Sequence, residues 1–218
     1  MNRILVALVG LLVFAPTVSA APVLNPPTPE SLRDSRPLFS WTLASDERAN
    51  TITVSTSAAV TPEGEFFDEN RVTGDALTDL TQWQPTSRLS AGAYYWNLQW
   101  YKQDFSQQGY TPPSAFTIPL RLEGARVSVT QSKYFDTEVS YSVVSNAKSI
   151  VTTCTVLDGV RVVRRKSKRL PFPTPGVRAK GSCMMAVPDA LNGKRLRAVV
   201  KVVAGVKSVS ASRVFTAR

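Results

Sequence analysis

The chain has 218 residues, with 26 Lys and Arg against 16 Asp and Glu, a formal net charge of +10, and no His. The lack of His excludes His-based catalytic triads, His–Cys dyads and imidazole zinc sites, and two Cys are too few for a structural zinc site. No phosphate-binding loop, dinucleotide fingerprint or Ser nucleophile elbow occurs, so we expect a protein that is not an enzyme and holds no cofactor.

Residues 1–20 have the pattern of a secretory signal peptide. Arg3 gives a positive start, residues 4–15 are almost wholly apolar, and a small-residue cleavage site ends at Ala20. No later apolar stretch approaches the roughly 18 residues that a membrane helix needs. We therefore predict cleavage after Ala20 and a secreted, extracellular protein with no membrane span in its mature chain. The sequence leaves open whether the protein stays at the cell surface.

Residues 21–119 show short runs rich in Val, Thr, Phe, Tyr and Trp between clusters of Pro, Gly, Asn, Asp and Ser, which is typical of an all-β domain. Period-2 alternation places Phe39, Trp41 and Leu43 on one face of a strand. The strands that we expect lie at 36–43, 50–57, 64–67, 79–85, 93–101 and 114–119, with an edge piece at 22–26.

The strand expected at 93–101 divides its aromatic residues between two faces. One face carries Tyr94, Trp96, Leu98 and Trp100 and is nearly apolar, as a sandwich core requires. The other face carries Tyr95, Asn97, Gln99 and Tyr101. That second face is ordinary for a solvated strand, and it also suits a shallow glycan contact through Tyr95 and Tyr101.

This half of the chain resembles bacterial fibronectin type III-like domains over about residues 22–119. In such domains an early strand carries Phe-Ser-Trp, and a late strand with Tyr-Tyr-Trp follows a Leu-x-x-Gly corner. The resemblance implies a β-sandwich in which the Tyr94 hydroxyl bonds to the backbone, and we expect Trp41 on the facing sheet to pack against Trp96. It implies no single function, because these modules act as spacers, adhesins and binders. The matching residues are Phe39, Ser40, Trp41, Leu89, Gly92, Tyr94, Tyr95, Trp96, Leu98, Phe116 and Ile118.

A change in charge near Pro119 marks a domain boundary. Residues 21–118 hold 6 Lys and Arg against 11 Asp and Glu, whereas residues 119–218 hold 19 against 5. We expect a second, immunoglobulin-like β-sandwich over residues 120–218. Its seven strands are expected at 125–132, 137–145, 149–157, 160–170, 180–188, 194–205 and 206–217.

Cys154 and Cys183 are the only two cysteines. An even count in an exported protein favours one disulfide, and two buried free thiols are the alternative. Carboxylates cluster at residues 61–70, as Glu63, Glu65, Asp68 and Glu69. A solvated acidic turn explains this cluster, and calcium binding is left open because the spacing lacks the regularity of an EF-hand.

A basic run at residues 160–181 is the strongest candidate for binding. It suits a polyanionic cell-surface or extracellular polymer, or a glycan, but its single aromatic residue, Phe172, argues against a base-stacking nucleic-acid surface. Two other readings are a solvated edge strand whose charges prevent aggregation and a contact with the acidic first domain. The cations are Arg161, Arg164, Arg165, Lys166, Lys168, Arg169, Arg178 and Lys180.

The sequence thus predicts an exported, non-catalytic module of two tandem β-sandwiches that contacts a polyanion through its basic second domain. A purely structural spacer and a glycan binder that uses Tyr95 and Tyr101 are the alternatives. The identity of the partner and the oligomeric state do not follow from the sequence.

Overall fold

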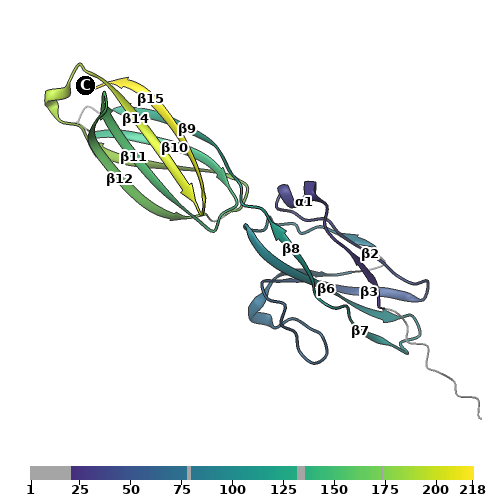
Figure 1. The fold of residues 1–218 in the computed structure, drawn as a ribbon. Coiled ribbons are helices and arrows are strands. Elements are labelled where there is room, and N and C mark those ends of the chain that lie inside the picture. The colour runs from purple at the N-terminus through teal and green to yellow at the C-terminus, as the bar shows by residue number, and fades with distance from the viewer. Residues whose placement is uncertain (1–20, 78–79, 132–135, 173) are drawn as a thin grey trace, which may run out of the picture.

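A computed structural model describes residues 21–77, 80–131, 136–172 and 174–218. The expected signal peptide lies outside these residues. Almost all of the regular structure is antiparallel strand, which confirms the all-β prediction. The strands form two β-sandwich domains that lie end to end, with the C-terminus at the far end of the second domain (Figure 1).

The first domain packs two sheets face to face. One sheet has the order β1-β2-β5, and the other has the order β4-β3-β6-β7 with β8 also paired to β6. The strands are β1 (Val23–Asn25), β2 (Phe39–Thr42), β3 (Glu47–Ser55), β4 (Arg71–Ala76), β5 (Gln82–Trp83), β6 (Gly92–Lys102), β7 (Gln108–Tyr110) and β8 (Ser114–Ile118).

Aromatic rings fill the core of this domain. The ring of Phe39 on β2 lies 4.8 Å from that of Trp96 on β6 and 5.2 Å from that of Phe116 on β8, measured between centroids. Trp41 is buried in the same core, whereas the ring of Phe39 packs against that of Trp96 with an angle of 48° between the two planes. The Tyr94 hydroxyl donates to the carbonyl oxygen of Ser90 at 3.0 Å, as the resemblance implied.

Several short elements of the first domain differ from the sequence prediction. Residues 64–67 are not a strand, because they form only one bridge, between Val60 and Phe66, before a 3-10 turn at Asp68–Asn70. Strands β4 and β7 were not predicted, since β4 is an exposed edge without apolar alternation and β7 has only three residues. Helix α1 (Pro29–Arg33) was also missed, although Thr28 caps it and Pro29 begins it.

The second domain follows the sequence prediction closely. Its sheets have the orders β13-β10-β9 and β12-β11-β14-β15. All seven expected strands are present, with ends shifted by three residues or fewer. They are β9 (Leu122–Gln131), β10 (Asp136–Ser145), β11 (Ser149–Asp158), β12 (Arg161–Pro171), β13 (Arg178–Ala186), β14 (Arg195–Ala204) and β15 (Lys207–Thr216).

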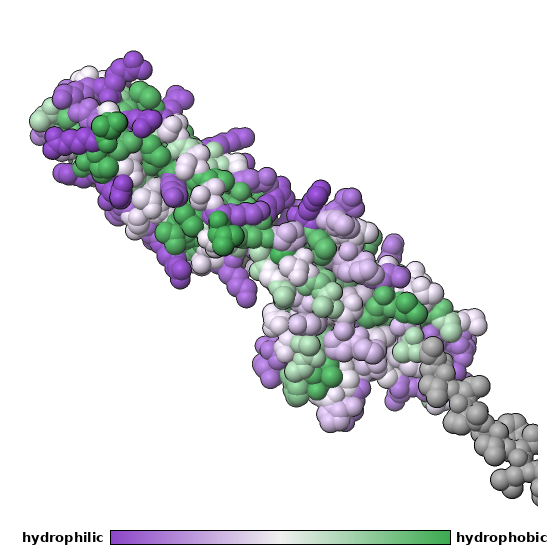
Figure 2. Space-filling view, viewed as in Figure 1, coloured by the Kyte–Doolittle hydropathy of each residue, from purple (hydrophilic) through white to green (hydrophobic). Residues whose placement is uncertain are grey.

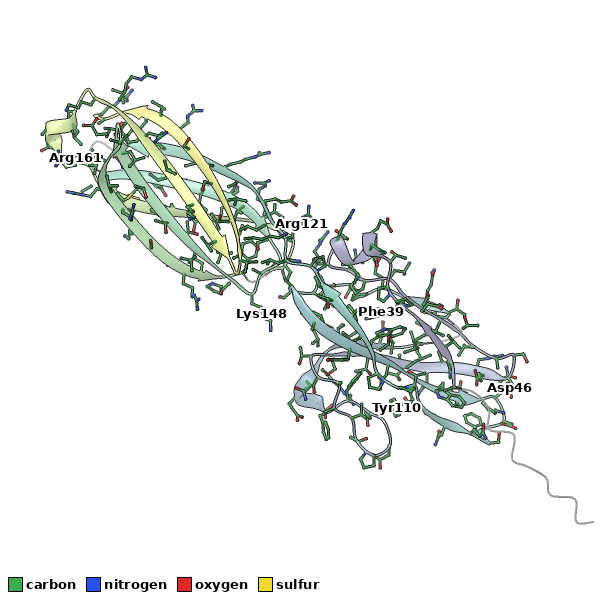
Figure 3. All side chains as sticks on the ribbon, viewed as in Figure 1. Phe39, Asp46, Tyr110, Arg121, Lys148 and Arg161 are labelled. Carbon is green, nitrogen blue, oxygen red and sulfur yellow. A yellow bond between two sulfur atoms is a disulfide. The ribbon has the colours of Figure 1, made fainter. Side chains whose placement is uncertain are left out.

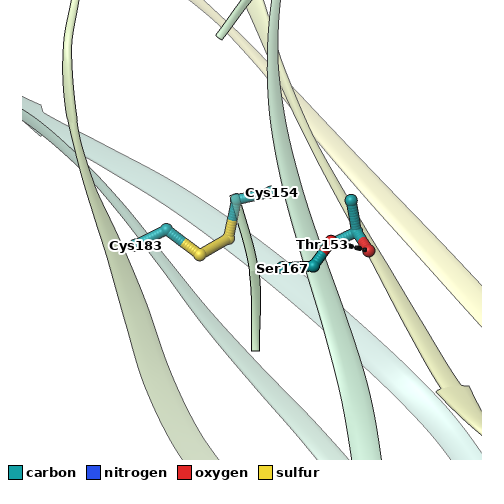
Figure 4. Close-up of a disulfide and its surroundings, with 4 residues drawn as sticks. All are labelled: Thr153, Cys154, Ser167 and Cys183. Atoms are coloured by element: carbon teal, nitrogen blue, oxygen red, sulfur yellow. Dashed lines mark hydrogen bonds between the residues drawn. A yellow bond between two sulfur atoms is a disulfide. The ribbon is translucent and has the colours of Figure 1, made fainter. Parts of the chain in front are cut away.

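A disulfide between Cys154 on β11 and Cys183 on β13 joins the two sheets of this domain and confirms the predicted pairing. The bridge lies on the core side of β11, whereas Thr153 faces the other way and shares a hydrogen bond of 2.8 Å with Ser167 (Figure 4). The surrounding core consists mainly of Val and Ala with few aromatic rings.

Asn146 holds the two domains together at their junction. Its side chain is fully buried, and Nδ2 donates to Ser35 Oγ at 3.0 Å and to Pro119 O at 2.8 Å, while Oδ1 accepts from Arg121 N at 2.7 Å. Its backbone carbonyl accepts from Ala91 N at 2.7 Å. Ser35 and Ala91 belong to the first domain, so one second-domain residue bonds to two separate loops of its neighbour.

A second contact supports the junction beside Asn146. Arg88 of the first domain pairs with Asp34 at 3.2 Å, and the aliphatic part of the Arg88 side chain passes close to Gly176 of the second domain. A Cβ at Gly176 would lie 2.7 Å from Arg88 Cδ, and the residue has φ of +72°, so this position favours Gly on both grounds.

Candidate functional site

The basic run forms an edge strand of the second domain. Strand β12 pairs with β11 alone and ends the four-stranded sheet. Every Lys and Arg side chain on it is exposed. Its partners in the antiparallel register indicate which side of the sheet each cation faces, because directly opposed residues point to the same face.

Three cations of β12 lie on the core side of the sheet, at its rim. They are opposite Val156, Cys154 and Thr152, all of which are buried. They stay exposed because β12 is at the sheet edge, and charges that point inward at an edge oppose pairing with another strand. Arg164, which lies opposite Val156, donates from Nε to the carbonyl oxygen of Ala186 on β13 at 3.0 Å. These rim cations are Arg164, Lys166 and Lys168.

The outer face of the same sheet carries a different set of cations. Arg165 and Arg169 lie opposite Thr155 and Val151 of β11, which point away from the core. Across β11, Lys201 and Arg197 of β14 lie opposite Thr153 and Leu157, on the same face. Arg195 faces the same way but lies beyond the last residue pair of β11 and β14. We call the four cations that flank β11, namely Arg165, Arg169, Arg197 and Lys201, the outer-face cations.

The other three predicted cations lie elsewhere. Arg161 begins β12 at the end of the domain farthest from the first domain (Figure 3). Arg178 and Lys180 are on β13 in the opposite sheet, where Arg178 donates to Gly124 O at 2.8 Å and Ser142 Oγ at 3.2 Å. The structure therefore distributes the eight predicted cations over four places rather than one surface.

Charge on the four-stranded sheet is almost entirely positive. Its strands carry eleven Lys and Arg and one carboxylate, Asp158, which pairs with Lys194 at 3.7 Å. Within the described part of the chain none of the eleven forms an ion pair. Strongly hydrophilic side chains project along this domain, with apolar patches between them, whereas the first domain is paler (Figure 2). The eleven are Arg161, Arg164, Arg165, Lys166, Lys168, Arg169, Arg195, Arg197, Lys201, Lys207 and Arg213.

Arg197 and Lys201 were missing from the predicted site. The signal that locates them is alternation: in residues 195–204 buried Leu196, Ala198, Val200 and Val202 alternate with residues that face outward. Assigning the run at 160–181 alone to the site overlooked strand β14, which begins 14 residues after the run ends but lies beside β11.

No ion pair among the described residues joins this basic run to the acidic first domain, as the charge contact that we considered would require. Strand β12 extends along the second domain, with Arg161 at its far end, and Asp46 lies at the opposite end of the molecule (Figure 3). The ion pairs of the described residues each join groups within one domain.

The two candidate glycan-binding tyrosines lie apart. Tyr95 is near one end of β6 and Tyr101 near the other, six residues or about 20 Å along the strand. Tyr101 stacks on Phe105 with centroids 5.2 Å apart, and Phe105 is 74% exposed. The structure therefore does not bring Tyr95 and Tyr101 into one site.

The β6 face between these tyrosines is covered, contrary to the prediction of a solvated face. Asn97 is 1% exposed and donates from Nδ2 to Gly64 O at 2.8 Å. The segment between β3 and β4, which includes buried Phe66, supplies this cover. Its sequence, rich in Glu and Asp, gave no sign that it would fold onto a neighbouring sheet.

The acidic cluster in this segment faces a cation. Glu65 and Asp68 both pair with Arg71, at 3.2 Å in the case of Asp68. Tyr110 lies nearby, and its pKa is raised by burial and by the Glu65 carboxylate. Among the described residues no three His, Cys, Asp or Glu side chains lie close enough together to hold a metal ion. Two of the four carboxylates are thus already paired with a guanidinium.

Comparison with known proteins gives little further information. No protein-family model and no curated protein matches the chain. Among solved structures, an alpha-L-rhamnosidase from Dictyoglumus thermophilum is similar over 83% of this chain and 27% of its own length, with a TM-score of 0.25 and 12% identity. This chain thus spans about a quarter of that protein, and likeness at this level carries no argument about function. In the described part of the chain no helix is both long and apolar enough to cross a membrane.

Proposed function

We propose that the protein is an exported, non-catalytic binding module that contacts a polyanionic polymer through the outer face of its four-stranded sheet. The observation that carries this proposal is the group of four outer-face cations, on strands that hold eleven Lys and Arg against one carboxylate. Such a surface attracts extended polyanions and releases their counterions on binding, so its affinity falls as salt rises.

Two further observations support parts of this proposal. The Cys154–Cys183 disulfide suits an oxidising compartment outside the cytosol, in agreement with an N-terminal secretory signal. The Tyr94–Ser90 hydrogen bond and the two facing sheets suit a fibronectin type III-like first domain.

The rim and outer-face cations offer a matched test. R165Q/R169Q/K201Q removes three outer-face charges, and R164Q/K166Q/K168Q removes three rim charges. Both variants lose the same net charge, so a difference between them reports position rather than overall charge. We expect wild-type protein to stay on a heparin column above about 0.15 M salt, a range in which nonspecific surface attraction is strongly screened. The outer-face variant should elute well before the rim variant.

Two results would contradict the proposal. One is elution of the wild-type protein at or below physiological salt. The other is identical elution of the two triple variants while both keep the wild-type Tm. The rim variant has a separate expected effect, which is increased aggregation in light scattering, because it removes the charges that protect an exposed strand edge.

A structural spacer is the second candidate function, and the junction at Asn146 favours it. A buried side chain with three hydrogen bonds holds the two domains in one arrangement, which is the property that a spacer needs. In a protein that acts only as a spacer, neither triple variant would change retention on the column.

A further inference from the structure

The outer-face cations alternate from side to side along strand β11. Each outward residue of β11 has one neighbour on β12 and one on β14, and together they form a row across the sheet. Starting from the end nearest the first domain, the cation of each successive row is Arg169 on β12, Lys201 on β14, Arg165 on β12 and Arg197 on β14. The other neighbour in each row is uncharged.

An uncharged track separates the two lines of cations. The outward residues of β11 are Val151, Thr153, Thr155 and Leu157, all partly buried. Successive rows are about 7 Å apart along the strand, and β12 and β14 are about 10 Å apart across it. The result is a strip, one strand wide, with a positive charge first on one side and then on the other.

We propose that this strip binds a linear polyuronate whose carboxylates alternate between two sides, lying along β11. The inference rests on the proposed function. It adds the class of the polymer and the strand along which the polymer lies. In a β-1,4-linked uronate each sugar is turned over relative to the last, so successive carboxylates point to opposite sides of a flat ribbon. The sheet presents its cations in the same order.

The chemistry of both partners suits this arrangement. The guanidinium groups of Arg165, Arg169 and Arg197 have the fork geometry that binds carboxylates in a bidentate manner. The apolar faces of the sugar rings would lie on the methyl groups of Val151, Thr155 and Leu157, while hydroxyl groups meet Thr153. A polymer with charges on all sides, such as polyphosphate, gains nothing from the alternation.

Serine residues in the row of Lys201 allow its charge to be moved without being lost. Thr153 lies in this row, with Ser167 on β12 and Lys201 on β14, and Ser210 of β15 is the next residue outward. S167K/K201S moves the cation across the track and places three cations in succession on β12. K201S/S210K moves it one strand outward on the same side and keeps the alternation. Both variants have the composition and net charge of the wild-type protein.

The test is calorimetric titration with a β-1,4-linked glucuronate oligomer of about ten sugars, and with polyphosphate of equal charge, at physiological salt. We expect S167K/K201S to bind the glucuronate oligomer about tenfold more weakly than K201S/S210K, the effect of one displaced charge-assisted hydrogen bond. The two variants should bind polyphosphate within about twofold of each other, because their net charges are equal.

The outcomes separate this inference from the function on which it rests. Equal affinity of the two variants for the glucuronate oligomer, with melting curves unchanged, would overturn the alternating strip and leave a polyanion-binding surface in place. Stronger binding of polyphosphate than of the glucuronate oligomer by the wild-type protein would also overturn it. No binding of either polymer by the wild-type protein would overturn the proposed function itself.

Discussion

The two domains share one architecture but stabilise it differently. The first domain buries Phe39, Trp41, Tyr94, Trp96 and Phe116 and has no cysteine, whereas the second has a Val- and Ala-rich core and a disulfide between its sheets. Each aromatic ring removes about 150–250 Å² from water, which is far more than Ala or Val can bury. The disulfide therefore adds stability to the domain whose core side chains are the smaller ones. Four tests, ordered by expected effect, examine this contrast.

Trp96 should show the largest effect in the first domain. Trp96→Ala removes a fully buried ring and should lower the free energy of unfolding by about 3–5 kcal/mol, measured by denaturant titration. Tyr95→Ala, on the opposite face of the same strand, serves as the control and should cost much less. Comparable costs for the two substitutions would contradict the assignment of their faces.

The disulfide should matter most to the second domain. Replacing both Cys154 and Cys183 with Ala should cost about 3–4 kcal/mol, because a loop of about 30 residues is no longer closed in the unfolded chain. Calorimetry should show the second domain melting earlier while the first domain keeps its Tm. A thiol titration after unfolding without reductant should find no reactive cysteine, and two reactive thiols would contradict the bridge.

The contact between the two domains should depend on the side chain of Asn146. Asn146→Ala leaves Ser35 Oγ, Pro119 O and Arg121 N without their buried partner, which should cost about 1–3 kcal/mol. Small-angle X-ray scattering should then show a broader range of distances between the domains. Asn192→Ala, in an exposed turn of the second domain, is the control. An unchanged scattering profile for Asn146→Ala would show that other contacts hold the junction.

Tyr94 should show the smallest effect, and one that depends on pH. Tyr94→Phe removes the bond to Ser90 and should cost about 1 kcal/mol at neutral pH. Burial raises the pKa of Tyr94 above its usual value of 10.0, so the unfolded chain loses this proton first. The contribution of Tyr94 is therefore complete below pH 10 and is lost as pH rises through the folded-state pKa. The two proteins should differ less in stability at alkaline pH, and a gap that widens there would contradict this assignment.

The sequence predicted what depends on local pattern and missed what depends on contacts between distant segments. The succession of strand-like runs and turn residues was sufficient for all seven strands of the second domain, because each strand has nine to eleven residues. The cover over Asn97 was not predictable, since it depends on a segment folding back across β6. Likewise, the run at 160–181 was visible as a cluster of charge, but its division between rim and outer face depends on pairing with β11.

The Asn146 junction also determines how far the orientation of one domain fixes the orientation of the other. A flexible linker would let each domain turn independently, and a polymer held by the second domain would leave the first domain free to point anywhere. Because Asn146 is bonded to Ser35 and Ala91, we expect the two domains to keep one orientation relative to each other. A polymer lying along β11 would then orient the first domain as well, without the entropic cost of ordering a hinge on binding. The two proposed functions, spacer and binder, are therefore compatible, and the side-chain amide of Asn146 would couple them.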